Sequence, residues 1–121
     1  MSQEDIEVLR RAAEANNRQD YEAFLDEFDP DVEFHGVMFG GEATVVRGHE
    51  GLLEYVRDLD EGFSVRDVQW SEFRDLGDRI LGLGRFDSPY AGLAEFKNGK
   101  CIKYRDYFDH GQALEAAGLS E

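Results

Sequence analysis

The dipeptide Asn98-Gly99, which lies between two strand-like runs, constrains the C-terminal part of the chain more than any other feature. Both central residues of a type I′ turn need a positive φ, so the dipeptide predicts a hairpin over Ala91–Asp109 in which Phe96 faces Cys101. Because side chains alternate along a strand, this register assigns each residue to one face. One predicted face carries Ala91, Leu93, Glu95, Ile102, Tyr104, Asp106 and Phe108, and the other carries Tyr90, Phe96, Cys101, Lys103, Arg105 and Tyr107.

Asp106 is a carboxylate in the middle of the predicted apolar face, and Glu95 lies near the turn, where water can reach it. A charged group among apolar neighbours is costly unless it is paired. Asp106 is therefore expected either to face a cavity or to be partnered within the sheet. In a cavity it could take up and release protons.

Composition narrows the classes of partner. The 121 residues suit one domain, 1–121, and the formal net charge of −14 argues against nucleic acid and anionic membranes, which bind basic surfaces. The chain has no apolar run near the ~20 residues needed to cross a membrane, and its charged N-terminus is unlike a signal peptide. We therefore expect a cytoplasmic protein, acidic overall. Its one cysteine, Cys101, excludes an internal disulfide and is expected to pack inertly.

Hydrophobic periodicity and turn residues divide the rest of the chain into helices and strands. The predicted helices run from Ser2 to about Arg18, Tyr21 to about Glu27, Gly48 to about Leu59, and Gly111 to Gly118. The predicted strands are Val32–Val37, Phe63–Leu76, Arg79–Phe86 and the two strands of the hairpin, with Thr44–Arg47 short and extended. Helices followed by a meander of strands indicate an α+β fold, with helices on one face of an antiparallel sheet.

Three segments carry a resemblance to a known family: VVRGHEGLLEYVRDL, DLGDRILGLGRF and FKNGKCIKYRDYFDHGQALEAAGL. They resemble the SnoaL-like branch of the NTF2-like superfamily, and the order of elements agrees over nearly the whole chain. The resemblance implies a cone in which a curved antiparallel sheet and about three packed helices surround a pocket. Relatives include polyketide cyclases, ketosteroid isomerases and limonene-epoxide hydrolases, so a small apolar molecule is the implied partner.

The sequence is also similar, more narrowly, to limonene-epoxide hydrolases, which use an Asp-Arg-Asp set. Arg85 and Asp87 match the Arg-x-Asp of that family, and Asp106 matches the first Asp of its RDYFD segment. The resemblance implies that one carboxylate takes a proton from water while the other donates one to the epoxide oxygen. The guanidinium between them would keep their pKa values apart.

This chain departs from the epoxide hydrolase pattern in two places. Phe34 and Gly36 stand where that family positions its water with Tyr and Asn. The connection after Arg85 is also shorter than in relatives, and Asp87 in Asp-Ser-Pro is equally typical of a turn residue.

Other residues could contribute to a site. His35, at a predicted strand end, could act as an acid or base near neutral pH, or be a partly exposed strand-end residue. Aromatic side chains that could line a pocket, or simply form the core, are Tyr21, Phe34, Tyr55, Trp70, Tyr104 and Phe108. The three histidines lack metal-ligand spacing and no cofactor motif is present, so we expect neither a metal nor a cofactor.

Three hypotheses follow. The first is a small-molecule pocket with isomerase, cyclase or hydrolase chemistry at Asp106, assisted by Arg85 or His35. The second is a non-catalytic binding or dimerisation module, with a homodimer through the sheet face that carries Phe96, Tyr90, Tyr107 and Arg105. The third, narrower hypothesis is an epoxide hydrolase. A cavity that touches Asp106 would favour the first hypothesis over the second.

Overall fold

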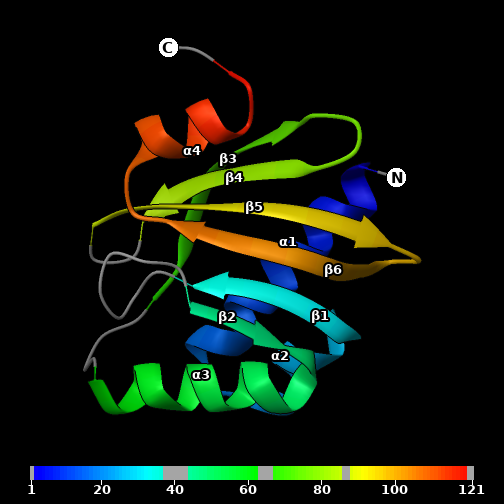
Figure 1. Ribbon diagram of the computed structural model, residues 1–121, viewed down its shortest axis with the longest axis vertical. Helices are drawn as coiled ribbons and strands as arrows, with labels where there is room; N and C mark the ends of the chain where they lie inside the picture. Colours follow the sequence, from blue (N-terminus) through cyan, green and yellow to red (C-terminus); the bar gives the residue numbers. More distant parts are fainter. Residues whose placement is uncertain (1, 37–43, 63–66, 86–87, 120–121) are drawn as a thin grey trace.

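The computed structural model describes residues 2–36, 44–62, 67–85 and 88–119 (Figure 1). Its helices are α1 (Ser2–Asn17), α2 (Tyr21–Asp26), α3 (Gly48–Gly62) and α4 (His110–Ala116). Its strands are β1 (Phe28–Gly36), β2 (Thr44–Arg47), β3 (Gln69–Asp75), β4 (Ile80–Arg85), β5 (Pro89–Lys97) and β6 (Lys100–Tyr107). The predicted α+β class is confirmed, and the extended segment at 44–47 pairs as a strand.

The described strands form one curved sheet in the order β2-β1-β6-β5-β4-β3. Strands β1 and β6 are parallel, and the other neighbouring pairs are antiparallel. The prediction of an antiparallel sheet therefore holds for every pair but this one. The parallel pair places β1 beside the C-terminal hairpin, so Phe34 lies next to Tyr104 in the middle of the sheet.

Two apolar clusters hold the helices to opposite faces of the sheet. Helices α1, α2 and α3 pack on the concave face with a core that includes Leu9, Phe24, Phe34, Leu52, Tyr55, Val56 and Tyr104. Helix α4 packs on the convex face over β4 and β5, in a cluster of Leu81, Leu83, Ala91, Ala113, Leu114 and Ala117 (Figure 1). The expectation of helices on one face is thus wrong for α4. Fully burying a leucine such as Leu81 contributes about 1.5–3 kcal/mol, which makes this second cluster a real part of the fold.

The predicted hairpin turn is confirmed, because Asn98 and Gly99 have φ values of 53° and 79°. Phe96 faces Cys101 as predicted, but the next pair is Glu95 with Lys103. Strand β6 therefore contains one extra residue, Ile102, in a β-bulge. The bulge shifts the register of every pair beyond it.

This shift corrects the predicted faces of the hairpin. Tyr90 and Ala94 now lie on the concave face with Tyr104 and Asp106, whereas Leu93 lies on the convex face. The predicted placement of Tyr90 opposite to Asp106 was wrong because a one-residue slip moves every side chain to the other face. The shift moves Glu95 off the apolar face and places it opposite Lys103 on β6, so that opposite charges face each other.

Other boundaries differ modestly from prediction. Strand β1 begins at Phe28 rather than Val32, and its irregular pairing between Phe28 and Glu33 accommodates Pro30, which has no backbone N–H. A second bulge lies in β3 between Trp70 and Glu72. Part of the long strand predicted from Phe63, residues 63–66, lies outside the described residues.

Within the described ranges, no helix has the length and apolar character required to cross a membrane.

Cys101 provides a test of this packing. Its side chain is fully buried, its Sγ donates to the Lys103 carbonyl at 3.3 Å, and burial raises the pKa of the thiol far above its usual value. Because the thiolate is the reactive form, the native protein should not react with Ellman's reagent, and one thiol per chain should react in guanidinium chloride. Fast stoichiometric labelling without denaturant would contradict the buried position.

Candidate functional site

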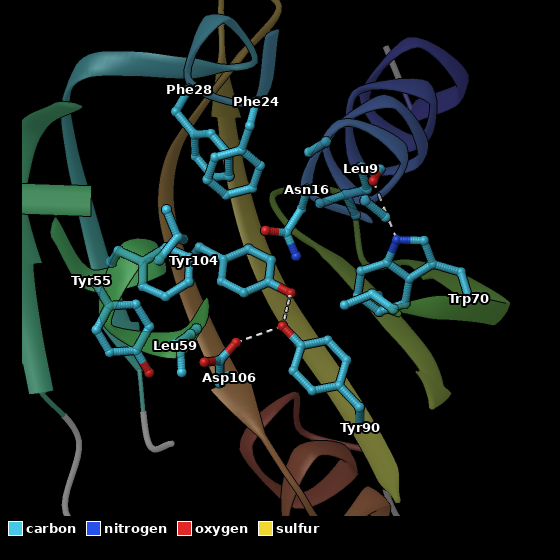
Figure 2. A pocket seen from close by; sticks show the side chains of 15 residues that line it. Leu9, Asn16, Phe24, Phe28, Tyr55, Leu59, Trp70, Tyr90, Tyr104 and Asp106 are labelled. Carbon is cyan, nitrogen blue, oxygen red and sulfur yellow. Dashed lines mark hydrogen bonds between the residues drawn. The ribbon is translucent and has the colours of Figure 1, made fainter. Parts of the chain in front are cut away.

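A cavity of about 60 Å³ lies between the concave face of the sheet and helices α1, α2 and α3 (Figure 2). A buried water needs roughly 10–15 Å³ of such volume, so the cavity suits a few waters or a small organic group. Its walls are mostly aliphatic and aromatic. The lining residues are Leu9, Ala12, Ala13, Asn16, Phe24, Phe28, Phe34, Tyr55, Val56, Leu59, Val68, Trp70, Tyr90, Tyr104 and Asp106.

Asp106 and two tyrosines form a polar cluster on the sheet wall of this cavity. The Tyr90 hydroxyl donates to Asp106 Oδ1 at 2.5 Å, and the hydroxyl oxygens of Tyr90 and Tyr104 are 2.6 Å apart (Figure 2). All three side chains are buried, with Asp106 only 4 % exposed. The sequence left open whether Asp106 faces a cavity or is partnered within the sheet. In the structure it does both.

Strands β5 and β6 position these three side chains. Asp106 lies beside Gly92 in the register, and Tyr104 lies beside Ala94. A Cβ atom at Gly92 would lie 2.1 Å from the Tyr104 hydroxyl oxygen, so only glycine leaves space for that ring to cross β5 towards Tyr90. The close approach of the phenols to Asp106 therefore depends on a missing side chain.

Both phenols remain protonated across the ordinary pH range. Burial is the main cause that raises the pKa of Tyr90 well above its usual value, and the negative charge of Asp106 adds to the effect. The same two causes, in the same order, raise the pKa of Tyr104, although its hydrogen bond with Tyr90 acts in the opposite direction. Each phenol thus keeps its single hydrogen for a hydrogen bond.

His110 fixes the backbone next to this cluster. It is the first residue of α4, where the Asp109 side chain caps the helix by accepting from Gln112 N at 3.1 Å. His110 Nε2 lies 3.0 Å from both the Gly84 and the Tyr90 carbonyl oxygens. A ring N–H donated to these two oxygens ties the end of β4 to the start of β5, where Tyr90 lies.

The structure brings five of the sequence-predicted site residues together around the cavity. They are Phe34, Tyr55, Trp70, Tyr104 and Asp106. Tyr21 and Phe108 contact the same core without lining the cavity formed by the described residues; Phe108 packs on Tyr90 with ring centroids 5.3 Å apart. Their predicted contact with a ligand is therefore not supported by their placement.

Arg85 and His35 are not brought to Asp106. Arg85 is exposed and continues the convex-facing series of Leu81 and Leu83, so its side chain lies on the other face of the sheet. His35 neighbours Arg105 in the register, also on that face. Alternation along the strands explains both placements. Asp87 lies outside the described residues.

His35 instead takes part in a charged group on the convex face. His35 Nε2 lies 2.5 Å from Glu33 Oε2, and Arg47 donates to Glu33 Oε1 at 2.7 Å. These two hydrogen bonds, with that from His35 the larger, hold the pKa of Glu33 down to about 2. Across the described residues, no group of three or more His, Cys, Asp and Glu side chains is arranged to hold a metal ion.

Among the polar residues that line the cavity, sequence reasoning missed two, Tyr90 and Asn16. Asn16 is 8 % exposed on α1, and Figure 2 shows its amide pointing from α1 towards Tyr104. The signal for Asn16 was its helical spacing from Leu9, which places an amide on a buried stripe. The signal for Tyr90 was the charge of Glu95 on the predicted apolar face. A bulge that moves Glu95 off this face also brings Tyr90 onto the face of Asp106.

The curved sheet, the concave-face helices and the cavity between them define an NTF2-like cone, the architecture that the resemblance implied. Residues 9–110 match the SnoaL-like domain family, and the chain belongs to that family. No curated protein matches the chain.

Solved structures with the same fold have low sequence identity to this chain. Bal32a, from a soil-derived mobile gene cassette, is 21% identical, with 94% of this chain and 95% of that chain covered and a TM-score of 0.79. TerC, co-crystallised with polyporic acid, is 21% identical with 95% and 98% covered and a TM-score of 0.76. A proposed polyketide cyclase from Sinorhizobium meliloti is 18% identical with 84% and 94% covered and a TM-score of 0.71. At these identities the similarity shows the fold alone.

Replacing Gly92 tests the space on which the cluster depends. Gly92→Ala should lower the free energy of unfolding by about 1–3 kcal/mol, because its Cβ would overlap the Tyr104 hydroxyl. The matched control is Gly51→Ala on α3, whose Cβ would make an ordinary 3.4 Å contact with Val46 and which should be neutral or stabilising by up to about 1 kcal/mol. Urea unfolding followed by Trp70 fluorescence measures both, and equal effects would contradict the geometry.

Proposed function

We propose that this protein binds a small, largely apolar molecule in the cavity and that Asp106 transfers a proton to or from it. The observation that carries this proposal is the position of Asp106, a buried carboxylate on the wall of an aromatic cavity. Buried acids at cavity walls are frequent acid-base catalysts, since burial and specific partners tune their proton affinity. Isomerisation, cyclisation and hydrolysis can each include such a transfer.

The surroundings of Asp106 suit proton transfer. The hydrogen bond from Tyr90 fixes the orientation of the carboxylate, and His110 fixes the backbone of Tyr90. The aromatic walls, including Phe34 and Trp70, exclude most water from the reacting group and strengthen electrostatic interactions there. Asp106 would take a proton from an acidic O–H or C–H of the ligand and return it at another atom or to the product.

The relatives are compatible with this class of ligand. TerC was co-crystallised with polyporic acid, and another structure with the fold is a proposed polyketide cyclase. The epoxide hydrolase hypothesis needs Arg85 next to Asp106, and the convex position of Arg85 gives it no support. The small cavity volume favours, as a second candidate, a pocket that binds its ligand without a reaction.

The variant Asp106→Asn distinguishes the two candidate functions, proton transfer at Asp106 and ligand binding without a reaction. With small cyclic ketones and α-hydroxyketones in D₂O, the wild-type protein should accelerate exchange of the hydrogens next to the carbonyl, observed by proton NMR. Asp106→Asn should reduce that acceleration on the order of 10²–10⁴-fold while leaving ligand binding measurable. Asp78→Asn, a change at an exposed carboxylate with 81% side-chain exposure, is the matched control and should leave the rate unchanged. Equal rates in Asp106→Asn and wild type would refute the catalytic role.

We also infer a homodimer through the convex face of the sheet, on a different set of residues from that first predicted. Tyr90 and Phe96 turn inwards, and α4 covers β4 and β5. The remaining part of this face carries charges of both signs, among them Glu33, Lys103 and Arg105. Such a surface can be self-complementary about a two-fold axis.

Light scattering during size-exclusion chromatography tests this dimer. The wild-type protein should elute with twice the mass of one chain, and Arg105→Glu should shift it to the mass of a monomer, because like charges would then face each other across the axis. A wild-type mass of one chain at micromolar concentration would contradict the dimer.

A further inference from the structure

Two neighbouring glycines leave a gap among the side chains of the concave face. Gly82 on β4 pairs directly with Gly92 on β5, and the same row of the sheet continues to Phe73 on β3 and to Asp106 on β6. Gly92 lies two residues from the inward-facing Ala94, so it and its partner Gly82 share the concave face. The row that holds the candidate acid therefore contains two adjacent positions without a Cβ atom.

Aromatic rings from neighbouring rows fill this gap. A Cβ atom at Gly82 would lie 2.7, 2.9 and 3.1 Å from three atoms of the Trp70 ring, and these are the three nearest atoms to it. All three belong to the six-membered part of the indole, which therefore lies directly over the backbone of β4. The Tyr104 ring lies in the same way over Gly92. Both rings line the cavity, so the two glycines let its aromatic wall lie close against the sheet.

The neighbours of Trp70 restrict how its ring can move. The bulge between Trp70 and Glu72 brings Trp70 and Phe73 to the same face, with ring centroids 5.5 Å apart. The Tyr90 ring packs against the indole at 5.6 Å, and Nε1 of the indole donates to the Leu9 carbonyl of α1 at 3.2 Å (Figure 2). A ring held in this way yields to pressure from β4 by moving away from the sheet, into the cavity.

We propose that Gly82 determines the size of the largest ligand that the cavity accepts, because it allows the Trp70 ring to lie against β4. This inference rests on the proposed function, since it concerns the molecule bound beside Asp106. The cavity volume of about 60 Å³ is less than half that of an engineered cavity of ~150 Å³ that binds benzene, so space is limiting. One methylene group more or less in an apolar pocket changes affinity by roughly 10–200-fold.

Cyclic ketones with four to eight ring atoms provide graded probes, because each differs from the next by one methylene group. In Gly82→Ala, the nearest atom of Trp70 would have to move by about 0.7 Å to restore an ordinary contact of 3.4 Å. The affinity for the ketone that the wild-type protein binds most tightly should therefore fall about tenfold or more, and larger rings should lose more affinity than smaller rings. Ligand-observed NMR titrations measure these affinities.

A compensating substitution separates an effect on ligand size from a general loss of stability. Trp70→Phe removes the far part of the indole, which the added methyl group would otherwise meet. The double variant with Gly82→Ala and Trp70→Phe should therefore regain affinity for the larger rings. Trp70→Phe alone should raise the affinity for larger rings relative to smaller ones.

Gly51→Ala is the matched control. Gly51 is on α3 and does not line the cavity formed by the described residues, so this variant should keep the wild-type order of affinities. Thermal melting confirms that each variant is folded before binding is measured. If Gly82→Ala alone does not fold, Trp70→Phe and the double variant decide the question, because both alter the same contact.

The outcomes separate this inference from the proposed function. A wild-type order of affinities in folded Gly82→Ala, or an equal loss for every ring size, would overturn the inference and leave the ligand pocket intact. A selective loss that Trp70→Phe does not reverse would overturn the role of the indole. Absence of binding of every ketone by the wild-type protein would overturn the proposed pocket and the inference with it. A failure of the Asp106→Asn exchange experiment would refute the catalytic role and leave the size selection standing.

Discussion

The hydrogen bond between Tyr90 and Asp106 is the interaction on which the candidate site depends. A carboxylate that is 4 % exposed in an apolar core is costly to ionise unless donors compensate for the lost water. Hydrogen bonds to a charged acceptor are roughly twice as strong as neutral ones, and Tyr90 supplies one at 2.5 Å. Its ring meanwhile packs against Trp70 and Phe108. The same side chain therefore completes the core and holds the acid, so stability and chemistry are coupled at this position.

Two features of the C-terminal hairpin make that hydrogen bond possible. The bulge at Ile102 rotates Tyr90 to the face that carries Asp106, and the missing side chain of Gly92 lets Tyr104 cross the neighbouring strand. Neither feature contributes much burial of its own. Together they convert a regular two-stranded ribbon, in which Asp106 would face Ala91, into a wall where two phenols meet a carboxylate. Small backbone irregularities near functional residues have this general effect of redirecting side chains.

The sequence was sufficient for the elements, the turn and the position of Asp106, but not for the partners of Asp106. Asn98-Gly99 specifies the turn locally, whereas the bulge depends on long-range pairing of β6 with both β5 and β1, which no local pattern encodes. Arg85 and His35 were expected near Asp106 from motif spacing and residue chemistry alone. Alternation could have excluded His35, because an inward Phe34 places the next side chain outwards. Tyr55, Trp70 and Tyr104 line the cavity, in keeping with the rule that large aromatic side chains seldom remain outside a core; their predicted contact with a ligand stays a prediction.

The sheet separates two groups of ionisable side chains, and that separation limits the chemistry available in the cavity. On the convex face, Glu33 accepts hydrogen bonds from His35 and Arg47, which keep its pKa near 2 and its charge satisfied there. On the concave face, Asp106 is the acid among the described lining residues, and its phenol neighbours have pKa values too high to release protons. Since the side chains of His35 and Arg85 lie on the convex face, Asp106 is the described lining residue to which the proposed proton transfer is assigned.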